Sequence, residues 1–370
     1  YIDWVKSDKL SADIFSNKKS NYYGIKTDCA DAAIALRVIY AFEQQLPVYF
    51  KDNDGNIITN ESLKYDFVPV GIERLKAMLE DLSNNIGSEV LADGNTYPIS
   101  LSDVRPGDVY ITKWRDASGI DTRHVYFIKD ILPTGDLLLY SSTQPTAIRP
   151  LLIRKGMPSH IIDGPPYGFK RFTRGKNFEK ADQSWSQYEY LKQGQKYYFS
   201  KIKESHQMLK DTLENNINQR LENICVALQT RADVISATLE YIVKNNNRCF
   251  SKEEYDEYST PSRDHNISFD IENLIYGWKI IKQRQKQSEL PENIQQALEY
   301  LAGKDLSDNA SNALNTFCLI KFESLSGQQV SMSIRSFYEG YKSGAISSNP
   351  NESIDVRWGI ARETDICPKR

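Results

Sequence analysis

The sequence predicts an α+β protein, with a helix packed on a small antiparallel sheet in the N-terminal half and a mainly α-helical region after it. Three observations support this prediction. An Ala-rich apolar helix is expected over residues 28–45, and three short apolar strands separated by turns follow within residues 105–145. Helical periodicity then dominates residues 183–245, so the two halves of the chain should differ in architecture.

The first predicted helix has clear start and stop signals. Asp28 is a good N-cap, and Asp31 three residues on is an acidic version of the capping-box partner. The residues between Ala30 and Ile39 are apolar on most sides of the helix, which is the pattern of a helix buried in a core. The Leu46-Pro47 pair ends it, because the residue before a proline avoids helical geometry.

Short strands and turns are expected next. Residues 52–56 form a turn between two short apolar strands, and Ile72–Leu82 has the spacing of an amphipathic helix. In the predicted sheet, Pro106-Gly107-Asp108 is a turn and residues 116–122 are a polar loop. The three expected strands begin at Val109, His124 and Leu137.

The composition changes after Gly175, so we place a domain boundary near residue 178 and expect domains over 1–178 and 179–370. Beyond residues 183–245, helices are expected over Ile271–Lys286 and from Pro291, and mixed strand and helix from Phe317. The polar stretch 257–264 fits an interdomain loop better than a ligand site.

Bulk composition excludes several classes of function. The chain has 370 residues, a formal net charge of -3 and 22 tyrosines. A near-neutral balance does not indicate nucleic acid or an anionic membrane as partner, and no run approaches the roughly 18 apolar residues of a membrane span. No motif predicts a metal site or a cofactor. The first residue is Tyr1, so a signal peptide removed earlier is one explanation for the start.

Five cysteines leave the redox state open. They fit one free thiol with up to two disulfides, and they fit five reduced thiols equally well. Cys249 and Cys367 lie in polar, loop-like sequence and are a candidate pair.

Cys29 and His124 are the candidate nucleophile and general base. Cys29 follows an N-cap at the first turn of the helix, where unpaired N–H groups and the macrodipole favour a thiolate. His124 begins an apolar strand that fixes its position, and its setting suits a base better than those of the three other histidines. A small buried cysteine and a surface histidine are the ordinary alternatives.

The order of a helix-borne Cys, a strand-borne His and a further strand resembles the papain-like superfamily, and more closely the NlpC-type cell-wall cysteine peptidases and related CHAP amidases. Asp28-Cys29-Ala30-Asp31 is similar to that family's Asp-Cys-Ser-Gly helix start. Arg105-Pro106-Gly107-Asp108-Val109 resembles its Pro-Gly-Asp turn, and Arg123-His124-Val125 its Ser-His-Val strand. The resemblance covers roughly residues 20–150. The long separation of Cys29 from His124 implies an insertion within residues 47–100.

The resemblance implies a cysteine hydrolase that cleaves peptide or amide bonds in peptidoglycan, in the periplasm or after secretion. It places a third polar residue on the strand after the base, where Tyr140 lies nearest and Ser142 and Gln144 are alternatives. The implied substrate contacts are the following residues: Tyr22, Tyr23, Asp31, Trp114 and Arg123. The helical region is expected to bind wall or a protein partner, or to shield the catalytic half.

Two alternatives remain open. One is a transglutaminase-like or effector-type cysteine enzyme that acts on proteins. The other is a non-catalytic wall-binding or interaction protein that keeps the fold but lacks a working third residue.

Overall fold

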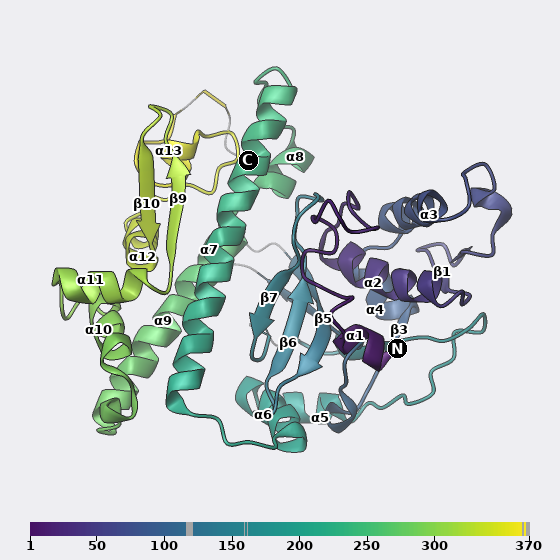
Figure 1. Ribbon diagram of the computed structural model, residues 1–370, viewed down its shortest axis with the longest axis horizontal. Helices are drawn as coiled ribbons and strands as arrows, with labels where there is room; N and C mark the ends of the chain where they lie inside the picture. Colours follow the sequence, from purple (N-terminus) through teal and green to yellow (C-terminus); the bar gives the residue numbers. More distant parts are fainter. Residues whose placement is uncertain (116–120, 159, 161, 365, 368–370) are drawn as a thin grey trace. The chain divides into compact units, whose positions relative to one another are not determined.

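The computed structural model describes residues 1–370 except 116–120, 159, 161, 365 and 368–370 (Figure 1). The chain divides into two compact units, Tyr1–Lys210 and Asp211–Arg370. Each unit has its own apolar core. The sequence placed the boundary near residue 178, which is too early, because the chain after that point still packs on the sheet of unit 1.

A six-stranded antiparallel sheet forms the centre of unit 1, with strand order β3-β8-β4-β5-β6-β7. The strands are β3 (Thr96–Pro98), β4 (Val109–Arg115), β5 (Asp121–Ile131), β6 (Leu137–Ser141), β7 (Leu152–Lys155) and β8 (Gly168–Phe172). The three strands expected from the sequence are β4, β5 and β6. The sheet also includes β7 and β8, in a stretch expected only as further strand or loop up to about Phe172, and β3, which the sequence did not indicate.

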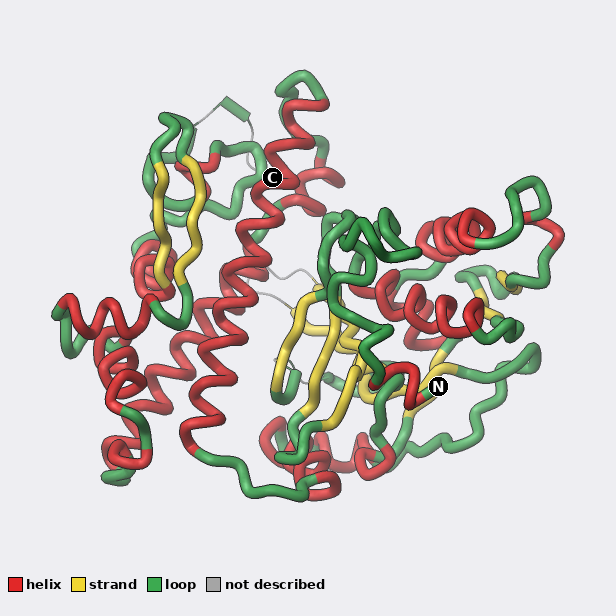
Figure 2. The backbone as a smooth tube through the Cα atoms, viewed as in Figure 1, coloured by secondary structure: helices red, strands yellow, loops and turns green. Residues whose placement is uncertain are grey.

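Helices contact both faces of this sheet, α2 (Cys29–Glu43) and α4 (Ser88–Gly94) beside the strands and α5 (Gln187–Leu191) and α6 (Gln195–His206) near one end of them (Figures 1 and 2). Helices α2 and α4 lie on one face, which we call the α2 face. Lys170 of β8 reaches this face and donates to the Ala92 carbonyl of α4. Figure 2 shows α2 as a straight helix beside the strands, in agreement with the apolar pattern of residues 28–45.

Helices α5 and α6 contact the other face, which we call the α6 face. The ring of Tyr110 on β4 lies 6.0 Å from that of Phe199 on α6. The buried Gln187 side chain accepts from the Phe169 N–H of β8 at 3.0 Å and donates to its carbonyl at 2.8 Å. These contacts explain why unit 1 extends to Lys210.

The predicted insertion within residues 47–100 forms a layer beside α2. It contains β1 (Tyr49–Lys51), β2 (Ile57–Thr59), the 3-10 turn η1 (Leu63–Tyr65), α3 (Ile72–Asn85) and α4. Strands β1 and β2 pair antiparallel around the turn at residues 52–56, as expected. Before α2, the N-terminal segment contains α1 (Ile2–Lys6), whose Val5 carbonyl accepts from buried Lys129 of β5 at 2.6 Å.

Unit 2 is mainly helical. Its helices are α7 (Leu213–Lys244), α8 (Lys252–Tyr258), α9 (Pro261–Gln283), η3 (Gln287–Glu289), α10 (Glu292–Leu301), α11 (Asp308–Asn315), α12 (Ile334–Lys342) and α13 (Ile354–Arg357), and β9 (Leu319–Glu323) pairs with β10 (Gln329–Ser333). The stretch 257–264 is not a loop. It contains the end of α8 and the start of α9, and Asp264 is fully buried there in an ion pair with Arg231 at 2.6 Å.

Two disulfides join distant parts of unit 2, Cys225 to Cys318 and Cys249 to Cys367. The second confirms the pair considered from the sequence, and Cys29 is the free cysteine. Structural disulfides persist in oxidising compartments, so this pattern is typical of a protein outside the cytoplasm.

Among the described residues, no helix has both the length and the apolar character needed to cross a membrane.

Candidate functional site

The candidate nucleophile Cys29 is the first residue of α2 and is partly exposed. The Asp28 carboxylate caps the helix and accepts from the N–H groups of Ala30 at 2.9 Å and Asp31 at 3.0 Å. The Asp31 side chain accepts in return from the Asp28 N–H at 3.1 Å, which completes the capping box. The cap therefore uses the second and third N–H groups of the helix and does not use that of Cys29.

The environment of the thiol opposes ionisation. Burial raises the pKa of Cys29 well above its ordinary value, and the negative charges of Asp28 and Asp31 raise it further. The N–H groups of Val125 and Ala30 lower it by less. The position at a helix start predicted a depressed pKa. That expectation is wrong for this structure, because burial and two nearby carboxylates outweigh the helix terminus.

The thiol lies against β5 at the backbone N–H of Val125, the residue that follows His124 in the chain. Ile128 bonds toward the β4 side, since its N–H donates to the Asp108 carbonyl at 2.9 Å and its carbonyl accepts from the Gly107 N–H at 2.8 Å. Alternate residues of a strand bond to opposite sides, so the Val125 N–H is directed toward β6. Strand β6 ends at Ser141. The Cys29 thiol lies close enough to the Val125 N–H for that group to lower the thiol pKa.

The His124 ring points toward the α6 face. His124 pairs with Thr112 of β4, and Tyr126 pairs with Tyr110, so these side chains share one face of the sheet. The imidazole packs edge-on against the Tyr126 ring, with centroids 4.5 Å apart. The structure thus places Cys29 next to the backbone of the histidine segment, and the strand register directs the imidazole toward the α6 face.

The three candidates for the third catalytic residue lie elsewhere. Tyr140 pairs with Phe127, whose side chain lies on the face opposite to that of His124. Its ring is 5.8 Å from the Lys129 ammonium group. Ser142 is buried and donates to the Thr27 carbonyl at 3.0 Å, and Gln144 is exposed. None of these contacts orients the imidazole.

The predicted substrate contacts separate into a group of three, Tyr22, Tyr23 and Trp114, and a group of two, Asp31 and Arg123. The Tyr22 hydroxyl donates to Glu43, the last residue of α2, at 2.7 Å. Glu43 comes fourteen residues after Cys29 on α2. At the usual rise per residue of an α-helix, the two residues are about 21 Å apart along the helix axis. Tyr23 neighbours Tyr22 and is 37% exposed. Trp114 stacks on His160 at 3.9 Å on the α6 face.

Asp31 and Arg123 lie closer to the thiol. Asp31 belongs to the capping box, and burial followed by the charge of Asp28 raises the pKa of its carboxyl to about 6. Arg123 shares the α2 face with Val125, and its guanidinium contacts Glu89 of α4 at 2.9 Å and donates to the Tyr167 hydroxyl at 3.2 Å. Glu89 and Tyr167 were missed from the sequence, because neither sits in a motif.

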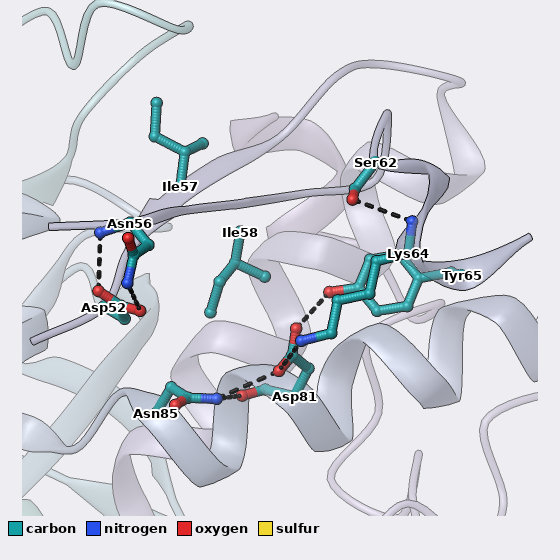
Figure 3. Close-up of a pocket in the computed structure, with 9 residues that line it drawn as sticks. All are labelled: Asp52, Asn56, Ile57, Ile58, Ser62, Lys64, Tyr65, Asp81 and Asn85. Carbon is teal, nitrogen blue, oxygen red and sulfur yellow. Dashed lines mark hydrogen bonds and ion pairs between the residues drawn. The ribbon is translucent and has the colours of Figure 1, made fainter. Parts of the chain in front are cut away.

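A hollow lies within residues 47–100, between the β1–β2 hairpin, η1 and α3 (Figure 3). Its volume is about 220 Å³. Sequence reasoning did not find it, because its walls come from three separate short elements. The hairpin around residues 52–56 and the helix over Ile72–Leu82 were expected as separate elements and not as parts of a site.

Comparison with known proteins gives no relative. No protein-family model, curated protein or solved structure matches the chain.

Proposed function

We propose that unit 1 is a papain-like cysteine hydrolase that cleaves peptide or amide bonds in peptidoglycan, with Cys29 as nucleophile and His124 as general base. One observation carries the proposal. The free thiol at the start of a buried helix adjoins the N–H of Val125, the residue directly after His124.

In the proposed reaction, the Cys29 sulfur attacks the carbonyl carbon of the scissile amide. His124 takes the thiol proton as the carbon–sulfur bond forms, then gives it to the leaving amine as the carbon–nitrogen bond breaks. The raised thiol pKa means that proton removal accompanies attack. Water, deprotonated by the imidazole, then hydrolyses the thioester and restores the thiol. The Cys29 N–H, which the cap does not use, supplies one oxyanion donor.

Catalysis in this scheme requires His124 to leave Tyr126 and turn toward β6. We propose that substrate binding supplies this change, and that the described arrangement is the resting one. The two disulfides favour a periplasmic or secreted enzyme, which is where peptidoglycan is accessible.

A non-catalytic wall-binding protein is the second candidate. It is favoured by the raised thiol pKa and by the packing of the imidazole on Tyr126. In that case Cys29 serves only as a small helix-start residue that packs against the core of unit 1.

The deciding experiment incubates the full chain with purified peptidoglycan and measures new amino termini. We expect release by the native protein, none by Cys29→Ala or His124→Ala, and unchanged release by His265→Ala, which alters an exposed histidine of unit 2. Release that persists in Cys29→Ala refutes the proposed nucleophile. Binding to wall without release supports the non-catalytic protein, and amine transfer to proteins without release from wall supports the transglutaminase-like alternative.

A further inference from the structure

The hollow in the insertion has the features of a binding site. It is open at the surface and lined by side chains from β2, η1 and α3 and from the turn before β2 (Figure 3). A space of about 220 Å³ is far larger than the roughly 10–15 Å³ that one buried water needs on the same measure. One sugar ring with its substituents is of this size.

A single carboxylate fixes the polar wall of this hollow. Asp81 accepts from the Lys64 ammonium group at 2.7 Å and from the Tyr65 hydroxyl at 2.6 Å. The Asn85 amide donates to the same residue, at 2.7 Å to its carbonyl and 3.1 Å to its carboxylate. Figure 3 shows these three side chains converging on Asp81. Each keeps further hydrogen-bonding capacity, so the wall offers donors and acceptors in fixed positions.

The remaining walls narrow the chemistry of the ligand. Two carboxylates, Asp52 and Asp81, and one ammonium, Lys64, give the lining a net charge of -1 (two negative, one positive), which disfavours phosphates and carboxylates. Ile58 offers an aliphatic surface beside the polar groups (Figure 3). Alternating C–H and hydroxyl groups on a neutral sugar match a wall that is partly aliphatic and rich in both donors and acceptors.

Apolar side chains also crowd the segment that follows β2. Leu63 and Phe67 are each 82% exposed and Val70 is 94% exposed. Large apolar side chains gathered on one exposed segment mark interaction surfaces more often than single ones do. Such a segment beside the hollow suits an extended ligand that continues past the bound ring.

We propose that this hollow binds one sugar residue of the wall glycan whose attached peptide is cleaved at Cys29. The identity of the glycan rests on the proposed function, whereas sugar binding itself does not. Helix α3 links the two sites, since its Ser83 hydroxyl lies against Asp31 in the first turn of α2. Asp81 and Asn85 flank Ser83 along α3 and face the hollow, so the sites lie on two sides of a helix about 10 Å wide.

The test titrates the full chain with N-acetylglucosamine and its β-1,4-linked dimer, followed by NMR of the ligand. We expect saturable binding of both sugars, tighter for the dimer. Asn85→Ala should weaken it at least about fivefold, the effect of losing one hydrogen bond. Lys76→Ala, a change on the exposed side of the same helix, should leave binding unchanged. Circular dichroism of each variant checks that α3 remains folded.

The outcomes separate this inference from the proposed function. Absence of saturable sugar binding at tens of millimolar overturns the inference even if wall peptides are cleaved. Sugar binding that Asn85→Ala weakens supports it even if no cleavage occurs. Lysine methyl ester is the competing probe, because two carboxylates also suit a cationic amine. Saturable binding of this ester, sensitive to Asn85→Ala and without sugar binding, overturns it as well.

Discussion

The charge of Asp28 should control the reactivity of Cys29. Asn is as good an N-cap as Asp, so Asp28→Asn removes the charge and keeps the helix start. A carboxylate about 6 Å from a thiolate, at an effective dielectric constant of about 20, costs on the order of 2–3 kcal/mol. This corresponds to roughly 1–2 pKa units after allowance for partial exposure and salt. The thiolate fraction near neutral pH should therefore rise about 10- to 100-fold.

The assay is the rate of iodoacetamide alkylation of the free thiol between pH 7 and 9, measured by mass spectrometry of the intact protein. Because burial and charge raise the thiol pKa, the folded native protein should react at least about tenfold more slowly than the urea-unfolded chain with its disulfides intact. Asp66→Asn, which removes an exposed carboxylate after η1, is the matched control and should change nothing. Faster alkylation of the folded than of the unfolded protein, or no response to Asp28→Asn, would refute the electrostatic account.

Three further predictions concern stability. Asp264→Ala should cost about 3–5 kcal/mol in the free energy of unfolding, because it leaves the fully buried Arg231 guanidinium without its carboxylate. Glu272→Ala, in an exposed ion pair, should cost less than about 1 kcal/mol. Urea unfolding with hydrogen exchange of unit 2 measures both losses, and equal losses would contradict the prediction. Burial lowers the pKa of Lys170 to about 7. Above that pH the unfolded chain binds more protons at Lys170 than the folded chain does, so the contribution of Lys170 to the free energy of unfolding should rise from pH 7 to 9. Thermal unfolding of Lys170→Met should show a smaller rise, and an unchanged slope would remove Lys170 as its source. Replacing Cys249 and Cys367 by Ser opens a cross-link that spans 118 positions and should cost about 2–5 kcal/mol of stability, measured in unit 2 by urea unfolding; no loss would mean that this bond does not constrain the unfolded chain.

Local patterns predicted single elements of this protein well. The Asp28 cap and the Ala-rich run gave α2 almost to the residue, and the turn residues at 52–56 gave the β1–β2 hairpin. Both signals act over a few residues, where propensity and capping decide the structure. The boundary at residue 178 was wrong because the packing of Gln187 against Phe169 is not a local signal.

The candidate site shows the same division. Residue types and their order made Cys29 and His124 candidates, and the cap at Asp28 followed from the sequence. The sequence could not give the register that pairs His124 with Thr112 and Tyr140 with Phe127. Since a shift of one residue moves a side chain to the other face of a sheet, register alone decides which groups can meet.

What the sequence by itself determined is therefore the α+β class, the start of α2 and the position of its thiol, because these depend on neighbours within a few residues. Only the tertiary structure decided the direction of the thiol pKa shift, the face on which His124 lies and the hollow around Asp81. Burial, strand register and the meeting of three short elements arise when distant parts of the chain pack together, and none of them leaves a period or a motif in the sequence.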